Sequence, residues 1–293
     1  MSHIRVQRVG PVGVITIDRP ARFNALDVTT AQDFRRAGLQ YARDDEVRVV
    51  VLRGLPRMFC SGADLKFIRD GGNAADLEYL SPRTAPRHDV GDATPRYGDA
   101  FKQILEYIHS AISEIRRAPK PFLAAVDGVA AAGGFGIAMS CDLVFASTRA
   151  SFEWAYAKTG LTGAESATFL LPRLVGWRRA MELLLLNPRL TARQAFEYGL
   201  VTAVWEPDPF DDNVMDVARR LADGPSHAFG LAKELINQAA GMDRLDDHLD
   251  RELAQLVRVA DGPEFAEGID AFFAKRRPLF SHPAPPAHPT PKG

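Results

Sequence analysis

Two stretches of small residues have the composition needed to bring main-chain amides close to a ligand. Residues 59–65 (FCSGADL) and 124–147 (AAVDGVAAAGGFGIAMSCDLVFAS) each run from an apolar segment into glycine and alanine. We expect one helix to begin at 62–65 and another at 133–139. Helix N-termini expose unpaired N–H groups that carry partial positive charge. Two such ends facing one cavity would stabilise a developing oxyanion; alternatively, the small residues only permit close packing of helix on sheet.

His109 is a second candidate for chemistry. The helix expected around it carries an apolar stripe at helical spacing, and His109 lies at the edge of that stripe, four residues after Leu105. A histidine there would hydrogen-bond a reacting group or activate water. The alternative is a boundary histidine with a satisfied hydrogen bond. The stripe consists of Phe101, Ile104, Leu105, Ile108, Ile112 and Ile115.

Several other chemistries are disfavoured by missing motifs. After Gly134 and Gly136, Met139 occupies the third glycine position of a dinucleotide fingerprint. The sequence has no phosphate-binding loop lysine after these glycines, no GxSxG nucleophile elbow and no HExxH zinc pair. The seven histidines show no ligand spacing. We therefore expect no metal and no bound cofactor.

The composition excludes two classes of partner. The 293 residues include 36 Lys and Arg and 37 Asp and Glu, which gives a net charge of −1 and no large basic surface for nucleic acid. No apolar run reaches the length needed to span a bilayer, and the N-terminus has no apolar signal segment. Cys60 and Cys141 are isolated, so we expect a reducing, cytoplasmic location.

Strands and helices alternate in the first part of the chain, which predicts an α/β fold. A helix is expected to begin near Asp27, and helical patterns dominate from residue 177 onward. Strands are expected at 12–18, 47–54, 122–128 and 142–147.

The domain prediction follows the same change in pattern. We expect a core over 1–200, with a mobile loop or lid at 70–100, because that stretch is rich in Gly, Pro and Asp. A helical region at 201–280 follows, and we assign oligomerisation to it. The proline-rich residues 281–293 are expected to be disordered.

Six segments in order resemble the signatures of the enoyl-CoA hydratase/isomerase, or crotonase, superfamily, over roughly residues 12–280. The resemblance implies a crotonase (ClpP-like) spiral of ββα units with a C-terminal helical region, assembled as a homotrimer or homohexamer. It also implies an acyl-CoA thioester as substrate and a place in fatty acid metabolism. The segments are RPARFNAL (19–26), FCSGADL (59–65), the stretch 124–147, LLPRLVG (170–176), TARQAFEYGLV (191–201) and EGIDAFFAKRRPLF (267–280).

The resemblance also assigns site residues. It implies that the backbone N–H groups of Ala63 and Gly133 form the oxyanion hole for the thioester oxygen, where one donor is typically worth ~3–4 kcal/mol in the transition state. Lys275 resembles the family's C-terminal lysine, which serves a neighbouring subunit in some members. The implied contacts to the CoA thioester are Arg22, Ala25, Ser61, Gly62, Ala63, Asp64, Leu65, Lys66, Gly133, Gly134 and Lys275.

The acids depart from the hydratase pattern. The two glutamates that hydratases of this family use fall on Gly136 and Tyr156, so the acid–base pair for adding water is missing from its usual place. Other members use an acid that falls on Ala164, and Glu165 lies directly beside it. A shift of one residue in this loop would bring the Glu165 carboxylate to the cavity. The alternative is a solvated loop acid. We expect Asp64 to start a helix and Asp142 to brace the structure. Phe152 and Trp154 are expected in the core or the pocket wall, and Glu153, which alternates with them, is expected to face the other side.

Residues 107–137 resemble the aroyl-CoA dehalogenase branch more closely than the hydratases. In that branch an active-site histidine falls on His109 and a ring-binding aromatic falls on Tyr156. Its nucleophilic aspartate, however, falls on Ala164. Direct displacement of chloride by this route is therefore not supported.

Three hypotheses remain open. The first is an isomerase or hydratase that works through an enolate held at Ala63 and Gly133, with Glu165 as the base. The second is a hydrolase or dehalogenase of an aromatic or cyclic CoA thioester that uses His109 and water. The third is a non-catalytic CoA-binding paralogue. Release of CoA or halide separates the second from the first, and binding without turnover identifies the third.

Overall fold

The computed structural model describes residues 2–72 and 97–281, and its centre is a six-stranded sheet in the order β1-β2-β3-β5-β7-β10. β1 pairs antiparallel with β2, and the other neighbours are parallel. A four-stranded sheet lies beside it in the order β4-β6-β8-β9. The larger sheet comprises β1 Ile4–Val9, β2 Val12–Ile17, β3 Val49–Arg53, β5 Phe122–Val126, β7 Leu143–Ser147 and β10 Ala203–Trp205; the smaller comprises β4 Met58–Cys60, β6 Val129–Ala131, β8 Ser151–Glu153 and β9 Leu190–Thr191.

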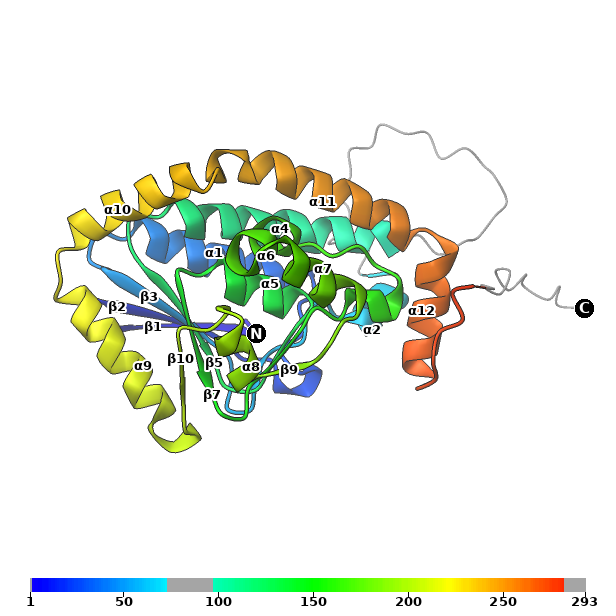
Figure 1. Cartoon of the computed structure of the whole chain (residues 1–293), viewed down its shortest axis with the longest axis horizontal. Helices are drawn as coiled ribbons and strands as arrows, with labels where there is room; N and C mark the ends of the chain where they lie inside the picture. Colours follow the sequence, from blue (N-terminus) through cyan, green and yellow to red (C-terminus); the bar gives the residue numbers. More distant parts are fainter. Residues whose placement is uncertain (1, 73–96, 282–293) are drawn as a thin grey trace, which may run out of the picture.

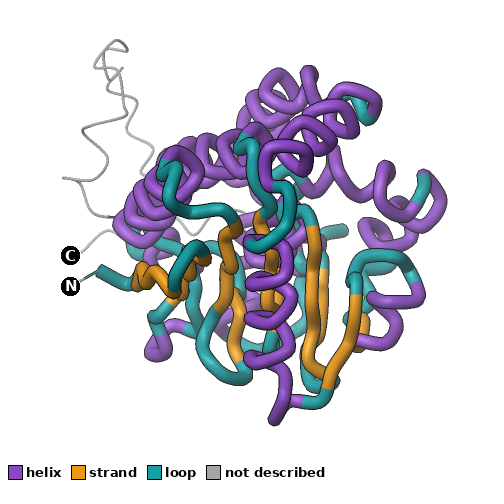
Figure 2. Tube along the Cα trace, turned by 90° about the vertical axis from the view of Figure 1, so that its left-hand side faces the viewer, coloured by secondary structure: helices purple, strands orange, loops and turns teal. Residues whose placement is uncertain are grey.

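The central strands are apolar throughout because helices cover both faces of the sheet (Figures 1 and 2). In β3, Val49 and Val51 pack against α9 (Pro207–Ala222), whereas Val50 and Leu52 belong to the core shared with α1 (Val28–Arg43) and α4 (Tyr97–Arg117). The continuous apolar run of β3 therefore contributes side chains to two hydrophobic cores, one on each face of the sheet.

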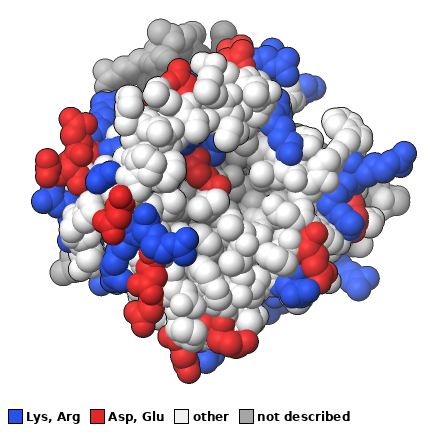
Figure 3. Space-filling model, turned by 60° about the vertical axis from the view of Figure 1, so that its left-hand side comes forward, with Lys and Arg blue, Asp and Glu red and all other residues white. Residues whose placement is uncertain are grey.

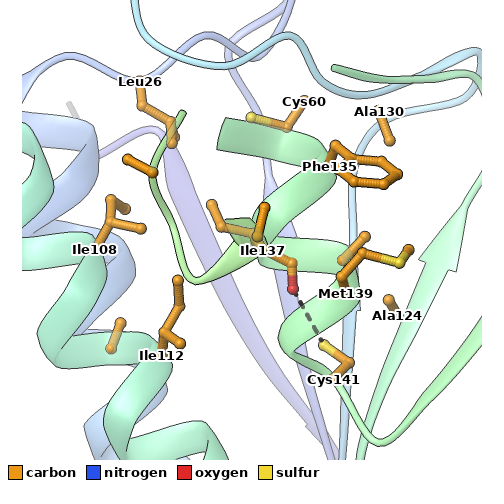
Figure 4. Packing of buried hydrophobic residues seen from close by; sticks show 14 of the residues in the cluster. Leu26, Cys60, Ile108, Ile112, Ala124, Ala130, Phe135, Ile137, Met139 and Cys141 are labelled. Carbon is orange, nitrogen blue, oxygen red and sulfur yellow. Dashed lines mark hydrogen bonds between the residues drawn. The ribbon is translucent and has the colours of Figure 1, made fainter. Parts of the chain in front are cut away.

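Helix α5 (Gly133–Ser140) is buried along its whole length. Figure 4 shows its side chains Phe135, Ile137 and Met139 among residues of both sheets, with Ile108 and Ile112 of α4 nearby. Cys141 donates a hydrogen bond to the Ile137 carbonyl at 3.7 Å. Burial raises the pKa of both cysteine thiols to about 12, so neither is a ready nucleophile.

The C-terminal part is helical, as expected. α10 and α11 run end to end across α4, and α12 turns down at the far end (Figure 1). Phe265 of α12 packs edge-on against Tyr97 and Phe101 of α4 and anchors this end of the chain. The remaining helices are α2 Leu65–Arg69, α6 Ala167–Val175, α7 Trp177–Leu185, α8 Ala192–Glu197, α10 Ser226–Ala239, α11 Leu245–Ala260 and α12 Pro263–Phe273, with short 3-10 turns η1 Pro20–Arg22, η2 Tyr156–Thr159 and η3 Met242–Arg244.

The four expected strands and the helix near Asp27 are confirmed. The Asp27 side chain accepts a hydrogen bond from Thr30 N and caps α1. The predicted C-terminal boundary of the loop at residue 100 is wrong, because α4 already begins at Tyr97. Most of that loop, 73–96, and the tail 282–293 lie outside the described residues.

The face of the molecule seen in Figure 3 matches the balanced composition of the chain. Figure 3 shows basic and acidic side chains interspersed on one face, around a hollow with largely uncharged walls. None of the helices in the described part of the chain combines the length and apolar character required to span a bilayer.

Candidate active site

The two loops of small residues meet in space. Gly62, after β4, has a φ of +93°, and a Cβ on it would lie 3.1 Å from the amide nitrogen of Gly133 and 2.8 Å from Cβ of Ala132. Such an approach is available only to glycine, both for its left-handed backbone and for the space. The main chain after Gly62 and the N-terminus of α5 are thereby brought together.

The amides of Ala63 and Gly133 have no acceptor in the part of the chain that the structure describes. Their neighbours do have acceptors: Asp64 N donates to Leu26 O at 2.8 Å and Ala132 N to Glu153 O at 3.1 Å. Ala132 has a φ of 47°, the turn through which the chain enters α5. Two adjacent unpaired donors are the arrangement that an oxyanion requires. Their role as the oxyanion hole stays a prediction.

A pocket of about 470 Å³ opens beside these amides. Its large apolar side chains include Tyr156 of η2, Phe101 of α4, Leu256 of α11, and Phe272 and Phe273 of α12. Of the predicted CoA contacts, seven line it: Arg22, Ala25, Ser61, Ala63, Asp64, Leu65 and Lys66.

The other predicted contacts lie outside that lining. Gly62 and Gly133 are chain neighbours of the lining residues Ala63 and Ala132, and Gly134 packs its backbone against the carbonyl of Cys60. Lys275 follows α12 and is exposed to solvent. Within one chain, therefore, Lys275 is not part of the pocket wall.

Glu165 reaches the pocket beside the free amides. A Cβ on Gly133 would lie 2.8 Å from Glu165 Oε1, and the Tyr156 hydroxyl donates a hydrogen bond to Oε2. The residue is only 2% exposed. Burial raises the pKa of its carboxyl to about 8, with a further rise from the charge of Glu252 and an opposing effect of the Tyr156 hydrogen bond. A carboxyl with this pKa both takes up and releases a proton near neutral pH.

Gly136 explains why the usual hydratase glutamate is missing. A Cβ at this position would lie 2.6 Å from the carbonyl oxygen of Glu165 and 2.7 Å from its Cβ. The space that a glutamate at 136 would need is therefore filled by Glu165 itself. The loss of one acid and the placement of the other are physically linked.

His109 lies behind Glu165 and does not line the pocket. Its Nε2 accepts a hydrogen bond from the Glu165 amide at 3.2 Å, and the ring is 7% exposed. Burial lowers the pKa of His109 to about 4, with a contribution from His248. A neutral ring is also what accepting this hydrogen bond requires. His109 contacts the main chain of the candidate base, and direct action on substrate or water stays a prediction.

Asp64 has the structural role that its position predicts. It caps α2 by accepting from Lys66 N and Phe67 N, and it pairs with Arg19 at 2.8 Å and Arg22 at 2.9 Å. Burial alone raises the pKa of Asp64, but the hydrogen bonds outweigh it and the net pKa is lowered. Asp64 stays ionised and anchors the loop that carries Ala63.

Asp142 is also structural, as predicted. It accepts from Phe122 N at 2.8 Å and pairs with Arg116 and Lys233, away from the pocket.

Glu153 lies on the other side of the chain from Phe152 and Trp154, as alternation predicts. Phe152 and Trp154 are buried in the core and do not line the pocket, whereas Glu153 does. Lys158 and Arg189 hold Glu153 there, the latter at 3.1 Å.

Glu252 in α11 was not anticipated at all. It lies 5% exposed behind Glu165, and its carboxylate accepts hydrogen bonds from the amides of Ser166 and Thr168. No pattern in the sequence links residues 86 positions apart. A buried glutamate in an amphipathic helix was the only available signal.

Comparisons with known proteins fit this geometry. The enoyl-CoA hydratase/isomerase family model matches residues 7–85 and 92–283. The chain is 32% identical to 4-chlorobenzoyl coenzyme A dehalogenase-2 of an Arthrobacter species, covering 93% of this chain and 91% of that protein. It is 33% identical to 1,2-epoxyphenylacetyl-CoA isomerase of Escherichia coli (strain K12), covering 92% of this chain and 95% of that protein.

A solved structure shows the same fold. The enoyl-CoA hydratase from Mycobacterium avium subsp. paratuberculosis K-10 superposes with a TM-score of 0.80 at 33% identity, covering 95% of this chain and 98% of that one. The predicted crotonase fold, with mixed α/β core and C-terminal helices, is therefore confirmed. Together with the family match, this means that the chain belongs to the enoyl-CoA hydratase/isomerase family and is an acyl-CoA-processing enzyme of the crotonase type.

Proposed function

We propose that this enzyme moves a proton between carbons of an acyl-CoA thioester through an enolate, as an enoyl-CoA isomerase. The observation that carries the proposal is the position of Glu165. Its carboxylate stands next to Gly133, whose free amide, with that of Ala63, is suited to hold the thioester oxygen. A single base beside an oxyanion hole is sufficient for proton transfer next to a carbonyl.

Glu165 alone is sufficient for both proton transfers of the proposed reaction. The thioester oxygen of a 3-enoyl-CoA accepts hydrogen bonds from the amides of Ala63 and Gly133. Ionised Glu165 removes a proton from C2, and the electron pair of that C–H bond moves toward the oxygen to give a dienolate. Glu165 then returns the proton to C4 and the double bond moves to C2–C3. The product has the mass of the substrate.

Hydration has less support in this pocket. It needs a second group that activates water, and the other two carboxylates in the lining are already paired. Glu153 is engaged by Lys158 and Arg189, and Asp64 by Arg19 and Arg22. Displacement of halide lacks its nucleophile because position 164 is a fully buried alanine. A hydrolase that depends on His109 is disfavoured because the ring does not reach the pocket.

Arg22 and Lys66 are the proposed contacts for CoA phosphates. Both line the pocket, and Lys66 is exposed with no carboxylate partner among the described residues. Lys275 would serve the pocket of a neighbouring subunit.

Assembly as a homotrimer or homohexamer also remains a proposal. It is supported by the apolar surface of α7 and the residue after it, where Trp177, Leu185 and Leu186 are 71%, 65% and 76% exposed. Light scattering of the purified protein tests it. Cytoplasmic location and a role in fatty acid metabolism stay predictions.

The reaction is tested by incubating the enzyme with a mixed panel of CoA thioesters, followed by mass spectrometry and chromatography. We expect a product of unchanged mass with a moved double bond, and no turnover by Glu165→Gln. A gain of water would select hydration, and release of free CoA or halide would select the second hypothesis. Tight CoA binding without turnover on any thioester would select a non-catalytic role.

A further inference from the structure

The loop that presents Glu165 is held from behind by two other helices. His109 of α4 accepts from the Glu165 amide, and Glu252 of α11 accepts from the Ser166 amide through Oε2 at 2.8 Å. The other oxygen of Glu252, Oε1, accepts from Thr168 N at 3.0 Å and from the Thr168 hydroxyl. The Glu252 carboxylate therefore accepts three hydrogen bonds from Ser166 and Thr168, which follow the candidate base within three residues.

This loop needs outside support because its backbone is strained. Glu165 and Ser166 have φ values of 53° and 62°, two consecutive non-glycine residues in the left-handed region. Ser166 is the N-cap of α6, yet its side chain makes no capping hydrogen bond. Glu252 supplies that cap from α11. Burial raises the pKa of Glu252 to about 7, against the hydrogen bonds from Thr168 and Ser166, and above that pH its negative charge also meets the positive end of α6.

Glu252 is placed to act on Glu165 and not on substrate. It does not line the pocket, whereas Leu256, one turn further along α11, does. Two histidines face it: His109 of α4, whose Nε2 is 3.9 Å from Oε2, and His248 of α11, whose Nε2 is 3.7 Å from Oε1. Glu165 and Tyr156 also feel its charge.

We propose that Glu252 is a positioning residue that fixes the direction of the Glu165 carboxylate by capping the amides of Ser166 and Thr168. The inference rests on the proposed role of Glu165 as the base. Releasing these amides would let the left-handed turn relax, and the carboxylate would leave its place beside Gly133. A misplacement of about 1 Å is enough to cost on the order of 100-fold in rate.

Glu252→Gln tests the proposal because a carboxamide keeps the shape but has one acceptor oxygen for three donors. We expect kcat to fall about 10- to 100-fold while KM changes less than about 3-fold, since the pocket lining is untouched. The acid limb of the kcat/KM profile should also move to lower pH. The charge of Glu252 raises the pKa of Glu165, and the variant removes that charge.

Two further variants make the test independent of folding. Thr168→Val keeps the amide donor to Glu252 and deletes the hydroxyl, which donates to Glu252 and also lies 2.8 Å from His248 Nε2. It should lower kcat about 2- to 5-fold. Asp142→Asn removes a carboxylate that also accepts a main-chain amide, from Phe122, but far from the pocket. It should leave kcat and the pH profile unchanged even if it lowers the melting temperature.

The outcomes separate this inference from the proposed function. Wild-type kcat and an unshifted acid limb in folded Glu252→Gln would overturn the inference, as would unchanged kcat in Thr168→Val if the first variant does not fold. If the inference is overturned in this way but Glu165→Gln is inactive in the same assays, the proposed function still stands. If Glu165→Gln keeps its turnover, the role of Glu165 fails and the inference fails with it.

Discussion

Glu165 should set the pH dependence of the reaction. It must be ionised to remove a proton, and burial raises its pKa to about 8. We therefore expect kcat/KM to increase with pH, with a midpoint near 8 in the free enzyme. Steady-state rates from pH 5 to 10 on the best thioester of the panel measure this. A midpoint near 4.5 would indicate that an exposed carboxylate acts instead.

Tyr156 should tune the same midpoint. Its hydroxyl donates to Glu165 Oε2, and this hydrogen bond lowers the pKa of Glu165. Burial raises the pKa of Tyr156 well above 10, so the hydroxyl keeps its proton. We expect Tyr156→Phe to move the acid limb of kcat/KM to higher pH, opposite to Glu252→Gln.

Tyr107→Phe is the matched control for Tyr156→Phe, because that hydroxyl accepts from Gln32 outside the pocket. It should leave the acid limb where it is. A shift to lower pH in Tyr156→Phe would contradict the assigned direction of the hydrogen bond.

At the residue scale, the sequence predicts what depends on small side chains. Ala63 and Gly133 each stand next to a glycine, Gly62 and Gly134, at which a Cβ would clash with neighbouring atoms. The structure brings the two loops together, as the sequence predicts. Alternation correctly places Glu153 opposite Phe152 and Trp154, but a strand pattern does not tell which of its two sides borders the pocket. Glu252 was missed, because its contact with the 165–168 loop depends on how α11 packs.

At the element scale, α5 and the loop before α6 form a pair that tolerates little change. Gly136 of α5 lies against the main chain of Glu165. We expect Gly136→Ala to lose about 1–3 kcal/mol of stability, because backbone atoms have to shift. We also expect kcat to fall about 10-fold or more, because the carboxylate moves with its backbone. Thermal unfolding and kinetics measure the two effects.

Gly38→Ala serves as the control for that variant. Gly38 lies in α1, and a Cβ there would meet only Ala111 Cβ, at 4.0 Å. Alanine is the better helix former by about 1 kcal/mol, so this variant should be as stable as wild type or more so. Full activity of Gly136→Ala would show that Glu165 does not depend on this packing.

The elements themselves were largely predictable from the sequence. Strands β2, β3, β5 and β7 are long apolar runs, and burial on both faces of a parallel sheet produces such runs. The short strands of the smaller sheet, such as β4 and β9, have no comparable signal. Their pairing depends on tertiary contacts, which a local pattern does not carry.

At the scale of the whole molecule, Glu165 should weaken the fold as pH rises. In the unfolded chain this carboxyl loses its proton above about pH 4.5, whereas in the folded enzyme it keeps it up to about 8. The unfolded state therefore binds fewer protons, and the free energy of unfolding falls by up to about 1.4 kcal/mol per pH unit in this interval.

The contribution of Glu165 is isolated by comparing wild type with Glu165→Gln in urea at pH 6.5 and 8.5. We expect wild type to lose more stability than the variant over this range. In the folded protein His109, with a pKa of about 4, stays neutral over this range, and its titration in the unfolded chain is common to both proteins. Glu252, whose pKa burial raises to about 7, is also present in both. Equal losses in both proteins would show that the Glu165 carboxyl does not have a raised pKa.

The central claim is that the enzyme forms an enolate at a thioester held by the amides of Ala63 and Gly133, with Glu165 as the base. Exchange of the C2 hydrogens of an acyl-CoA with solvent deuterium, followed by mass spectrometry, tests it most directly. We predict that wild type incorporates deuterium without loss of CoA, and that Glu165→Gln slows this exchange at least about 100-fold. Turnover of that acyl-CoA without any deuterium at C2, or exchange at the wild-type rate in Glu165→Gln, would contradict the account.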